Sequence, residues 1–178
     1  MRNVQLARLD PAIEQAIASD PEYLRALGQD NWARAAECVH RLGGRTLSTI
    51  PTRVDDLDWG GYFVVDAITR EAVGSCAFKT QTTEDGAAEI AYFTYPEFEG
   101  RGYATAMAVK LIRLASGSPS INQVLAHTLP QRNASTRVLE KAGMTFVGAV
   151  IDPEDGRVWR WRVAPGVKLV APSDPARR

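Results

Sequence analysis

The chain has 178 residues, enough for one well-buried domain and only marginally enough for two. Its 21 basic and 21 acidic residues balance, which argues against a nucleic-acid partner because proteins that bind phosphate backbones usually carry a basic excess. The chain has two cysteines and two histidines, so we expect no disulfide framework and no metal site. It has no run of about eighteen apolar residues, and its start lacks the apolar core of a signal peptide. We therefore expect a cytoplasmic protein without a membrane span.

Helical signals dominate the first 61 residues. Asp10, Asp20 and Asn31 are typical helix caps, and the first two precede proline at the first helical position. The segment "STIPTRVDDLDWGG" that follows is typical of a loop. We therefore expect helices and a loop over residues 1–61.

From residue 62 the pattern changes to alternating strands and helices. "YFVVDAI", "VGSCAFK" and "AEIAYFTY" are separated by turn signals and predict an antiparallel meander. A helix follows, whose apolar residues recur at helical spacing: Ala104, Met107, Ala108, Leu111, Ile112 and Ala115. The strand "INQVLAHTL", the helix "NASTRVLEKAG" and the strands "MTFVGAV" and "RVWRWRV" complete the pattern. The proline-rich residues 166–178 are expected to form a loosely ordered tail.

The stretch "EFEGRGYAT" places two glycines at the start of the first of these helices. The first amides of a helix have no internal partner, the helix dipole adds positive charge there, and glycine lets a phosphate approach the backbone. The dinucleotide pattern GxGxxG fails because Thr105 occupies the third glycine position, and the pattern GxxxxGK(S/T) is absent. The residues alone leave two interpretations open, an anion site or a glycine turn without a ligand.

The context of the loop resembles a known family. "AEIAYFTYPEFEGRGYATAMAVKLI" is similar to the central motif of the GNAT superfamily of N-acetyltransferases, whose loop reads Gln/Arg-x-x-Gly-x-Gly/Ala. "NASTRVLEKAGMTFVG" resembles the second half of the same domain. The sequences of both segments are most similar to the branch of the family that includes the ribosomal-protein N-terminal acetyltransferases. The resemblance covers roughly residues 62 to 163. It implies a single acetyltransferase domain over residues 1–165, with acceptor-side helices and loop at 1–61 and an acyl-CoA-binding core at 62–163.

The resemblance also implies an α+β fold: a mixed, mostly antiparallel sheet flanked by helices and splayed between its fourth and fifth strands. The amides from Arg101 to Thr105 would hold the coenzyme A pyrophosphate, and the main chain of Phe93 to Tyr95 would bond the pantetheine like an added strand. The cofactor-binding residues implied are Phe93, Thr94, Tyr95, Glu99, Gly100, Arg101, Gly102, Tyr103, Ala104, Thr105, Asn133 and Ser135. No metal is implied.

Two residues depart from the family pattern. Glu99 stands where Gln or Arg is usual, and a carboxylate beside a diphosphate is unfavourable, although Arg101 could offset it. Many members carry a tyrosine that protonates the departing thiolate, and the corresponding position here is near Leu139. Ser135 and Thr136 offer hydroxyls earlier on that helix, but capping is the commoner role of such residues at a helix start.

Acyl transfer to an amine needs a base, because a free amine is mostly protonated at neutral pH. Glu89 is the first candidate, since it lies on the strand that leads to the loop, in phase with Ala91, Phe93 and Tyr95. His127, late on the strand expected to open opposite the cofactor, is the second. The alternatives are a structural ion pair for Glu89 and a hydrogen-bonded core residue for His127.

We therefore expect an N-acetyltransferase that transfers the acetyl group of acetyl-CoA to a primary amine, on a small molecule or a peptide N-terminus, in a ternary complex. The alternative is a catalytically silent coenzyme-A-binding sensor or interaction module, which Glu99 and the missing tyrosine favour. We expect no nucleic-acid or membrane partner. A homodimer is a further expectation, because exposed strand ends in this architecture often pair.

Overall fold

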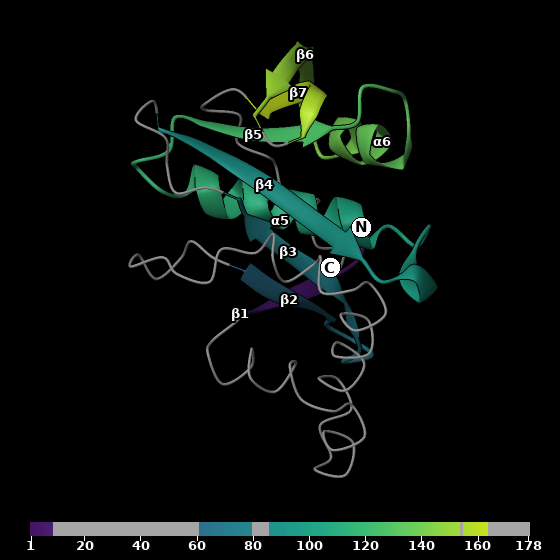
Figure 1. The fold of residues 1–178 in the computed structure, drawn as a ribbon. Coiled ribbons are helices and arrows are strands. Elements are labelled where there is room, and N and C mark those ends of the chain that lie inside the picture. The colour runs from purple at the N-terminus through teal and green to yellow at the C-terminus, as the bar shows by residue number, and fades with distance from the viewer. Residues whose placement is uncertain (9–60, 80–85, 154, 164–178) are drawn as a thin grey trace, which may run out of the picture.

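A computed structural model describes residues 1–8, 61–79, 86–153 and 155–163 (Figure 1). This part of the chain forms seven strands, one short 3-10 helix and two α-helices. Their bounds are β1 Val4–Arg8, β2 Gly61–Asp66, β3 Ala72–Phe78, β4 Ala87–Thr94, η1 Pro96–Phe98, α5 Tyr103–Ser116, β5 Gln123–Thr128, α6 Ala134–Lys141, β6 Thr145–Asp152 and β7 Gly156–Val163. The order predicted from residue 62 onward is confirmed.

The described strands make one mixed sheet in the order β1-β2-β3-β4-β5-β7-β6. Every neighbouring pair is antiparallel except β4 and β5, which run parallel. The β4–β5 ladder joins only Ala87–Glu89 to Gln123–Leu125, and beyond it the two strands diverge (Figure 1). The predicted α+β fold with a sheet splayed between the fourth and fifth strands is therefore confirmed.

Helix α5 packs on one face of the sheet, and its predicted apolar stripe is buried except for Ala104, which is half-buried. A Cβ built on Gly74 of β3 would lie 2.6 Å from Cε of Met107, so this strand lies directly against the helix. Gly74 pairs with Thr94, and every second residue of β4 therefore faces α5 as well, including Tyr92. Glu89 is on the opposite face. None of the described helices is long and apolar enough to span a membrane.

Strand β1 contradicts the expectation that residues 1–61 contain only helices and a loop. Val4–Arg8 pairs with β2 as an outer strand of the sheet, and Val4 is buried. The strand signal in the sequence is weak, because only Val4 and Leu6 alternate with polar or small residues before the helical signals begin. The predicted helices after this strand, the loop before residue 61 and the predicted tail lie outside the described residues.

Asp66, at the end of β2, joins the β2–β3 turn to the start of α5. Its Oδ1 accepts hydrogen bonds from the amides of Ile68 (2.8 Å) and Thr69 (3.0 Å), and its Oδ2 accepts one from the Tyr103 hydroxyl (2.7 Å). The side chain is buried. The Thr69 amide, the Tyr103 hydroxyl and the Ile68 amide together lower the pKa of Asp66 despite its desolvation.

We predict that Asp66→Asn lowers the free energy of unfolding by about 1.5–3 kcal/mol at pH 7, the range for hydrogen bonds to a charged group. Because the folded-state pKa is lowered, the stabilisation is present above the unfolded value of about 3.9 and is lost as the pH falls through the folded value. Urea unfolding at pH 7 and pH 3 should therefore show a smaller acid-induced loss in the variant than in the wild type. An equal loss in both proteins would contradict this role.

Candidate active site

The splay between β4 and β5 leaves main-chain groups of β4 facing the gap. The amide of Tyr95 donates to the carbonyl of Val73 (3.0 Å), and the carbonyl of Glu89 accepts from the amide of Lys79 (2.8 Å), so both residues bond toward β3. Main-chain groups alternate in direction along a strand. Thr94 is therefore the residue within the predicted span Phe93 to Tyr95 whose main-chain groups are directed toward the gap.

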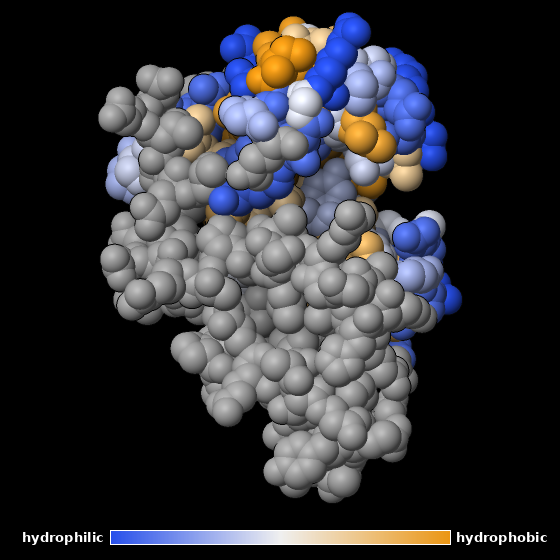
Figure 2. All heavy atoms as spheres, in the orientation of Figure 1, coloured by the Kyte–Doolittle hydropathy of each residue, from blue (hydrophilic) through white to orange (hydrophobic). Residues whose placement is uncertain are grey.

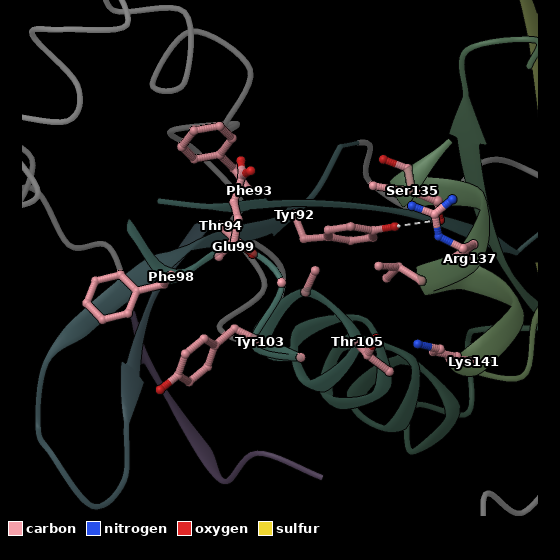
Figure 3. A pocket seen from close by; sticks show the side chains of 15 residues that line it. Tyr92, Phe93, Thr94, Phe98, Glu99, Tyr103, Thr105, Ser135, Arg137 and Lys141 are labelled. Atoms are coloured by element: carbon pink, nitrogen blue, oxygen red, sulfur yellow. Dashed lines mark hydrogen bonds between the residues drawn. The ribbon is translucent and has the colours of Figure 1, made fainter. Parts of the chain in front are cut away.

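A pocket of about 400 Å³ lies at this gap, between β4, the loop before α5, and α6 (Figure 3). Figure 2 shows the hollow at the right of the view, between the parts around α6 and η1. Its lining residues are Tyr92, Phe93, Thr94, Phe98, Glu99, Gly100, Gly102, Tyr103, Ala104, Thr105, Ala134, Ser135, Arg137, Val138 and Lys141. The hydroxyl of Thr94 is buried and has no hydrogen-bond partner among the described residues, so a polar ligand group could satisfy it.

The glycine loop forms an open cradle at the N-terminus of α5. Gly100 and Gly102 have φ angles of +70° and +87°, which glycine adopts at little cost. Among the described residues, a Cβ on Gly100 would meet nothing within 4 Å, and one on Gly102 would meet only Cγ of Arg2 at 4.0 Å. The first helical hydrogen bond runs from the amide of Ala106 to the carbonyl of Gly102 (3.2 Å), so the amides from Tyr103 to Thr105 precede the helical ladder. This geometry suits a phosphate group.

The cations at the pocket come from α6 and not from the loop. Arg101 places its guanidinium 5.6 Å from the ring centre of Phe98, and its carbonyl accepts from Nε of Arg2 (3.2 Å). Arg137 and Lys141, one turn apart on α6, line the pocket together with Glu99 (Figure 3). Arg101, expected to offset the Glu99 carboxylate, is thus not among the lining residues, and the positive charge of the pocket lies on its α6 side.

Two of the candidate residues on α6 have different surroundings. Asn133 caps the helix: its Oδ1 accepts from the amide of Thr136 (3.0 Å), and the Thr136 hydroxyl accepts from the amide of Asn133 (3.1 Å). Thr136 is thus used in capping, as expected. Ser135 lines the pocket. Leu139, at the position of the missing tyrosine, is completely buried in the core.

Tyr92 also belongs to the pocket, although it is not among the site residues predicted from the sequence. Its ring crosses from β4 toward α6, and its hydroxyl donates to the carbonyl of Ser135 (3.5 Å), a long hydrogen bond (Figure 3). Burial raises the pKa of Tyr92, so its hydroxyl keeps its proton at neutral pH. The pocket therefore contains a phenolic donor that comes from β4 and not from α6.

The two candidate bases, Glu89 and His127, are neighbours. Nδ1 of His127 lies 3.1 Å from Oε1 of Glu89, although the two groups are not aligned as a hydrogen bond. The side chains are 6% and 15% exposed, respectively. On the other side of the imidazole, Nε of Arg160 donates to Nε2 of His127 (3.0 Å).

Lys79 adds a positive charge to Glu89. Its Nζ lies 3.5 Å from Oε1 of Glu89 and 3.3 Å from Oδ2 of Asp155 in the β6–β7 turn. Burial lowers the pKa of Lys79, but the charges of Glu89 and Asp155 and their hydrogen bonds outweigh this effect and raise it above its ordinary value. Lys79 is therefore a cation at neutral pH, and Glu89 lies between it and His127.

Comparison with known proteins identifies the family. Residues 1–145 match the family model of the acetyltransferase (GNAT) domain. The chain belongs to the GNAT acetyltransferase family. Within it, the chain is 27% identical over 142 residues to the uncharacterized N-acetyltransferase p20 of Bacillus licheniformis, covering 78% of this chain and 75% of the relative.

Solved structures of two acetyltransferases share the fold. RimL, a ribosomal L7/L12 alpha-N-protein acetyltransferase in complex with coenzyme A, superimposes with a TM-score of 0.57 at 15% identity, over 91% of this chain and 94% of RimL. The aminoglycoside acetyltransferase AAC(6')-Ib, in complex with coenzyme A and kanamycin, gives 0.59 at 17% identity, over 91% and 95%. The predicted GNAT family is confirmed. The protein is an acyltransferase.

The cosubstrate of a GNAT acetyltransferase is acetyl-CoA, as predicted. The described residues fit it in two respects. The space beside Gly100 and Gly102 is open for a pyrophosphate, and the unpartnered hydroxyl of Thr94 lies farther along the same pocket, where an amide-bearing arm would need polar partners.

Proposed function

We propose that the protein transfers the acetyl group of acetyl-CoA to a primary amine, on a small molecule or a peptide N-terminus, by direct attack in a ternary complex. The observation that carries this proposal is the position of Glu89, a partly exposed carboxylate on the last paired residue of β4 before the splay. Two of the structures named above support an amine acceptor: RimL is by name an alpha-N-protein acetyltransferase, and AAC(6')-Ib is seen with coenzyme A and the aminoglycoside kanamycin. A cytoplasmic location stays a prediction from the sequence.

In this proposal, different residues of the site bind different parts of acetyl-CoA. The amides from Arg101 to Thr105 hold the pyrophosphate, and Arg137 and Lys141 add positive charge on the α6 side. The main chain at Thr94 bonds the pantetheine. Acetyl-CoA supplies an acetyl group activated as a thioester.

Glu89 takes a proton from the ammonium form of the acceptor, because only a neutral amine has the lone pair that forms the new C–N bond. The proton reaches the carboxylate directly or through one water. The second proton that the nitrogen loses as the amide forms passes to the thiolate or to solvent. The electron pair of the broken C–S bond remains on sulfur, where a hydrogen-bond donor stabilises the thiolate. Tyr92 supplies such a donor: the hydroxyl of Tyr103, the other tyrosine that lines the pocket, is held by Asp66, whereas the weak bond of Tyr92 to Ser135 is easily exchanged for a stronger one to an anion.

We predict that Tyr92→Phe lowers kcat about ten- to a hundredfold, equivalent to about 1.5–3 kcal/mol for a hydrogen bond to a charged group. The affinity for acetyl-CoA should change little, because the ring remains. Steady-state kinetics with isothermal titration calorimetry separates the two effects. Ser135→Ala is the comparison variant, since it keeps the main-chain carbonyl to which the Tyr92 hydroxyl donates. An unchanged kcat in Tyr92→Phe would mean that solvent, and not Tyr92, stabilises the departing thiolate.

The proposed function is tested by measuring thiol release with acetyl-CoA across a panel of amines and peptides. Release with one class of acceptor, and acetylated product by mass spectrometry, would establish the transfer and name the class. If acetyl-CoA binds but no acceptor causes release, the alternative of a coenzyme-A-binding sensor or interaction module replaces it.

A further inference from the structure

The imidazole of His127 is held between charged groups from two neighbouring strands. Glu89 of β4 lies 3.1 Å from Nδ1, and Nε of Arg160 on β7 lies 3.0 Å from Nε2. The register places His127 directly opposite Arg160 in the β5–β7 ladder, so the second contact is between paired residues. With 6% of its side chain exposed, His127 has little access to other partners.

The contact with Arg160 determines where the imidazole carries its proton. A guanidinium is always protonated and offers only donors. Nε2 must therefore be the acceptor, which requires a neutral imidazole with its hydrogen on Nδ1. That hydrogen is on the side of Glu89, and a rotation of the carboxylate would align the two groups.

We propose that Arg160 is a positioning residue: it holds His127 in the Nδ1–H tautomer, and His127 in turn orients the Glu89 carboxylate for amine deprotonation. This inference rests on the proposed function, in which Glu89 is the base. In this arrangement His127 cannot act as the general base, because the lone pair on Nε2 accepts the hydrogen bond from Arg160. The other charges around Glu89 are Lys79 of β3, at 3.5 Å, and Asp155, which Lys79 contacts.

The tautomer can be measured without any acetyl transfer. The chain has two histidines, His40 and His127, so long-range ¹H–¹⁵N spectra contain two imidazoles, which His40→Gln assigns. At pH 7.5 the wild type should show a pyrrole-type Nδ1 and a pyridine-type Nε2 for His127. Arg160→Met should shift His127 toward the Nε2–H form that free imidazoles favour. Arg162→Met is the matched control, since Arg162 lies two residues further along β7 and is exposed.

An Nε2–H or doubly protonated His127 in the wild type would overturn the proposal, as would an unchanged tautomer in Arg160→Met. Arg160→Lys, which keeps a cationic donor, should restore the wild-type tautomer at least in part. These readouts are independent of whether Glu89 is the base, so they separate this inference from the proposed function.

Kinetics tests the second half of the inference. Arg160→Met should lower kcat on the order of ten- to a hundredfold, the loss expected from a misplaced catalytic group, and leave the KM for acetyl-CoA unchanged. In a His127→Ala background the same substitution should cause no further loss. Additive losses would mean that Arg160 acts elsewhere. A fully active Glu89→Gln variant would instead overturn the proposed base, whatever the tautomer.

Discussion

Gly102→Val is expected to abolish acetyl-CoA binding. Gly102 is the cap of α5 with φ of +87°, a backbone conformation that disfavours a β-branched residue. The branched side chain would also fill the open cradle through which a phosphate approaches the amides from Tyr103 to Thr105. Loss of about two charge-assisted hydrogen bonds, each about 1.5–3 kcal/mol, raises Kd more than about a hundredfold. Isothermal titration calorimetry measures this directly.

Gly156→Val separates blocked binding from backbone strain. Gly156, in the β6–β7 turn, has φ of +69°, and no described atom lies within 4 Å of its built Cβ, so a substitution there carries a similar strain at a residue that does not line the pocket. The control should lose stability and keep its affinity. If Gly102→Val is folded and binds acetyl-CoA normally, the glycine loop is not the pyrophosphate site. Equal losses of affinity in both variants would assign the effect to strain.

The parts of the fold that the sequence predicted are those that local patterns determine. The apolar spacing from Met107 to Ala115 requires one buried helix face, and Gly100 and Gly102 mark a loop that non-glycine residues would strain. The strands of the meander are short, alternating and joined by turns. Each of these signals lies within about ten residues of the chain, so it can be recognised in the sequence without knowledge of the tertiary fold.

The parts that were missed depend on strand register. Alternation indicates that Glu89 and His127 each have a definite face, but only the parallel β4–β5 ladder brings them within 3.1 Å. Arg160 lies in the predicted strand "RVWRWRV", and nothing in the sequence names its partner; the β5–β7 register supplies His127. Tyr92 was read as part of a strand, because nothing in the sequence shows that α6 lies opposite its hydroxyl.

Glu89→Gln is expected to lower kcat about 10²- to 10⁴-fold at neutral pH, the usual contribution of a general base. The affinity for acetyl-CoA should stay close to wild type, because Glu89 does not line the pocket. Without the carboxylate, only amine that is already neutral can attack, and that fraction rises with pH. The deficit should therefore shrink as the pH rises, and pH–rate profiles of both proteins between pH 6 and 10 measure it.

The pH at which the kcat of Glu89→Gln approaches that of the wild type also depends on the pKa of the acceptor amine. For a peptide N-terminus, with a pKa of about 8, the variant should approach the wild-type rate near pH 9, whereas for an alkylamine, with a pKa above about 10, the deficit persists. Glu89→Asp is the matched control, since it keeps a carboxylate at a shorter reach and should retain part of the rate. A wild-type profile in Glu89→Gln would leave proton removal to solvent or to His127. The second of these requires that Arg160 release Nε2, which the tautomer measurement on His127 detects independently.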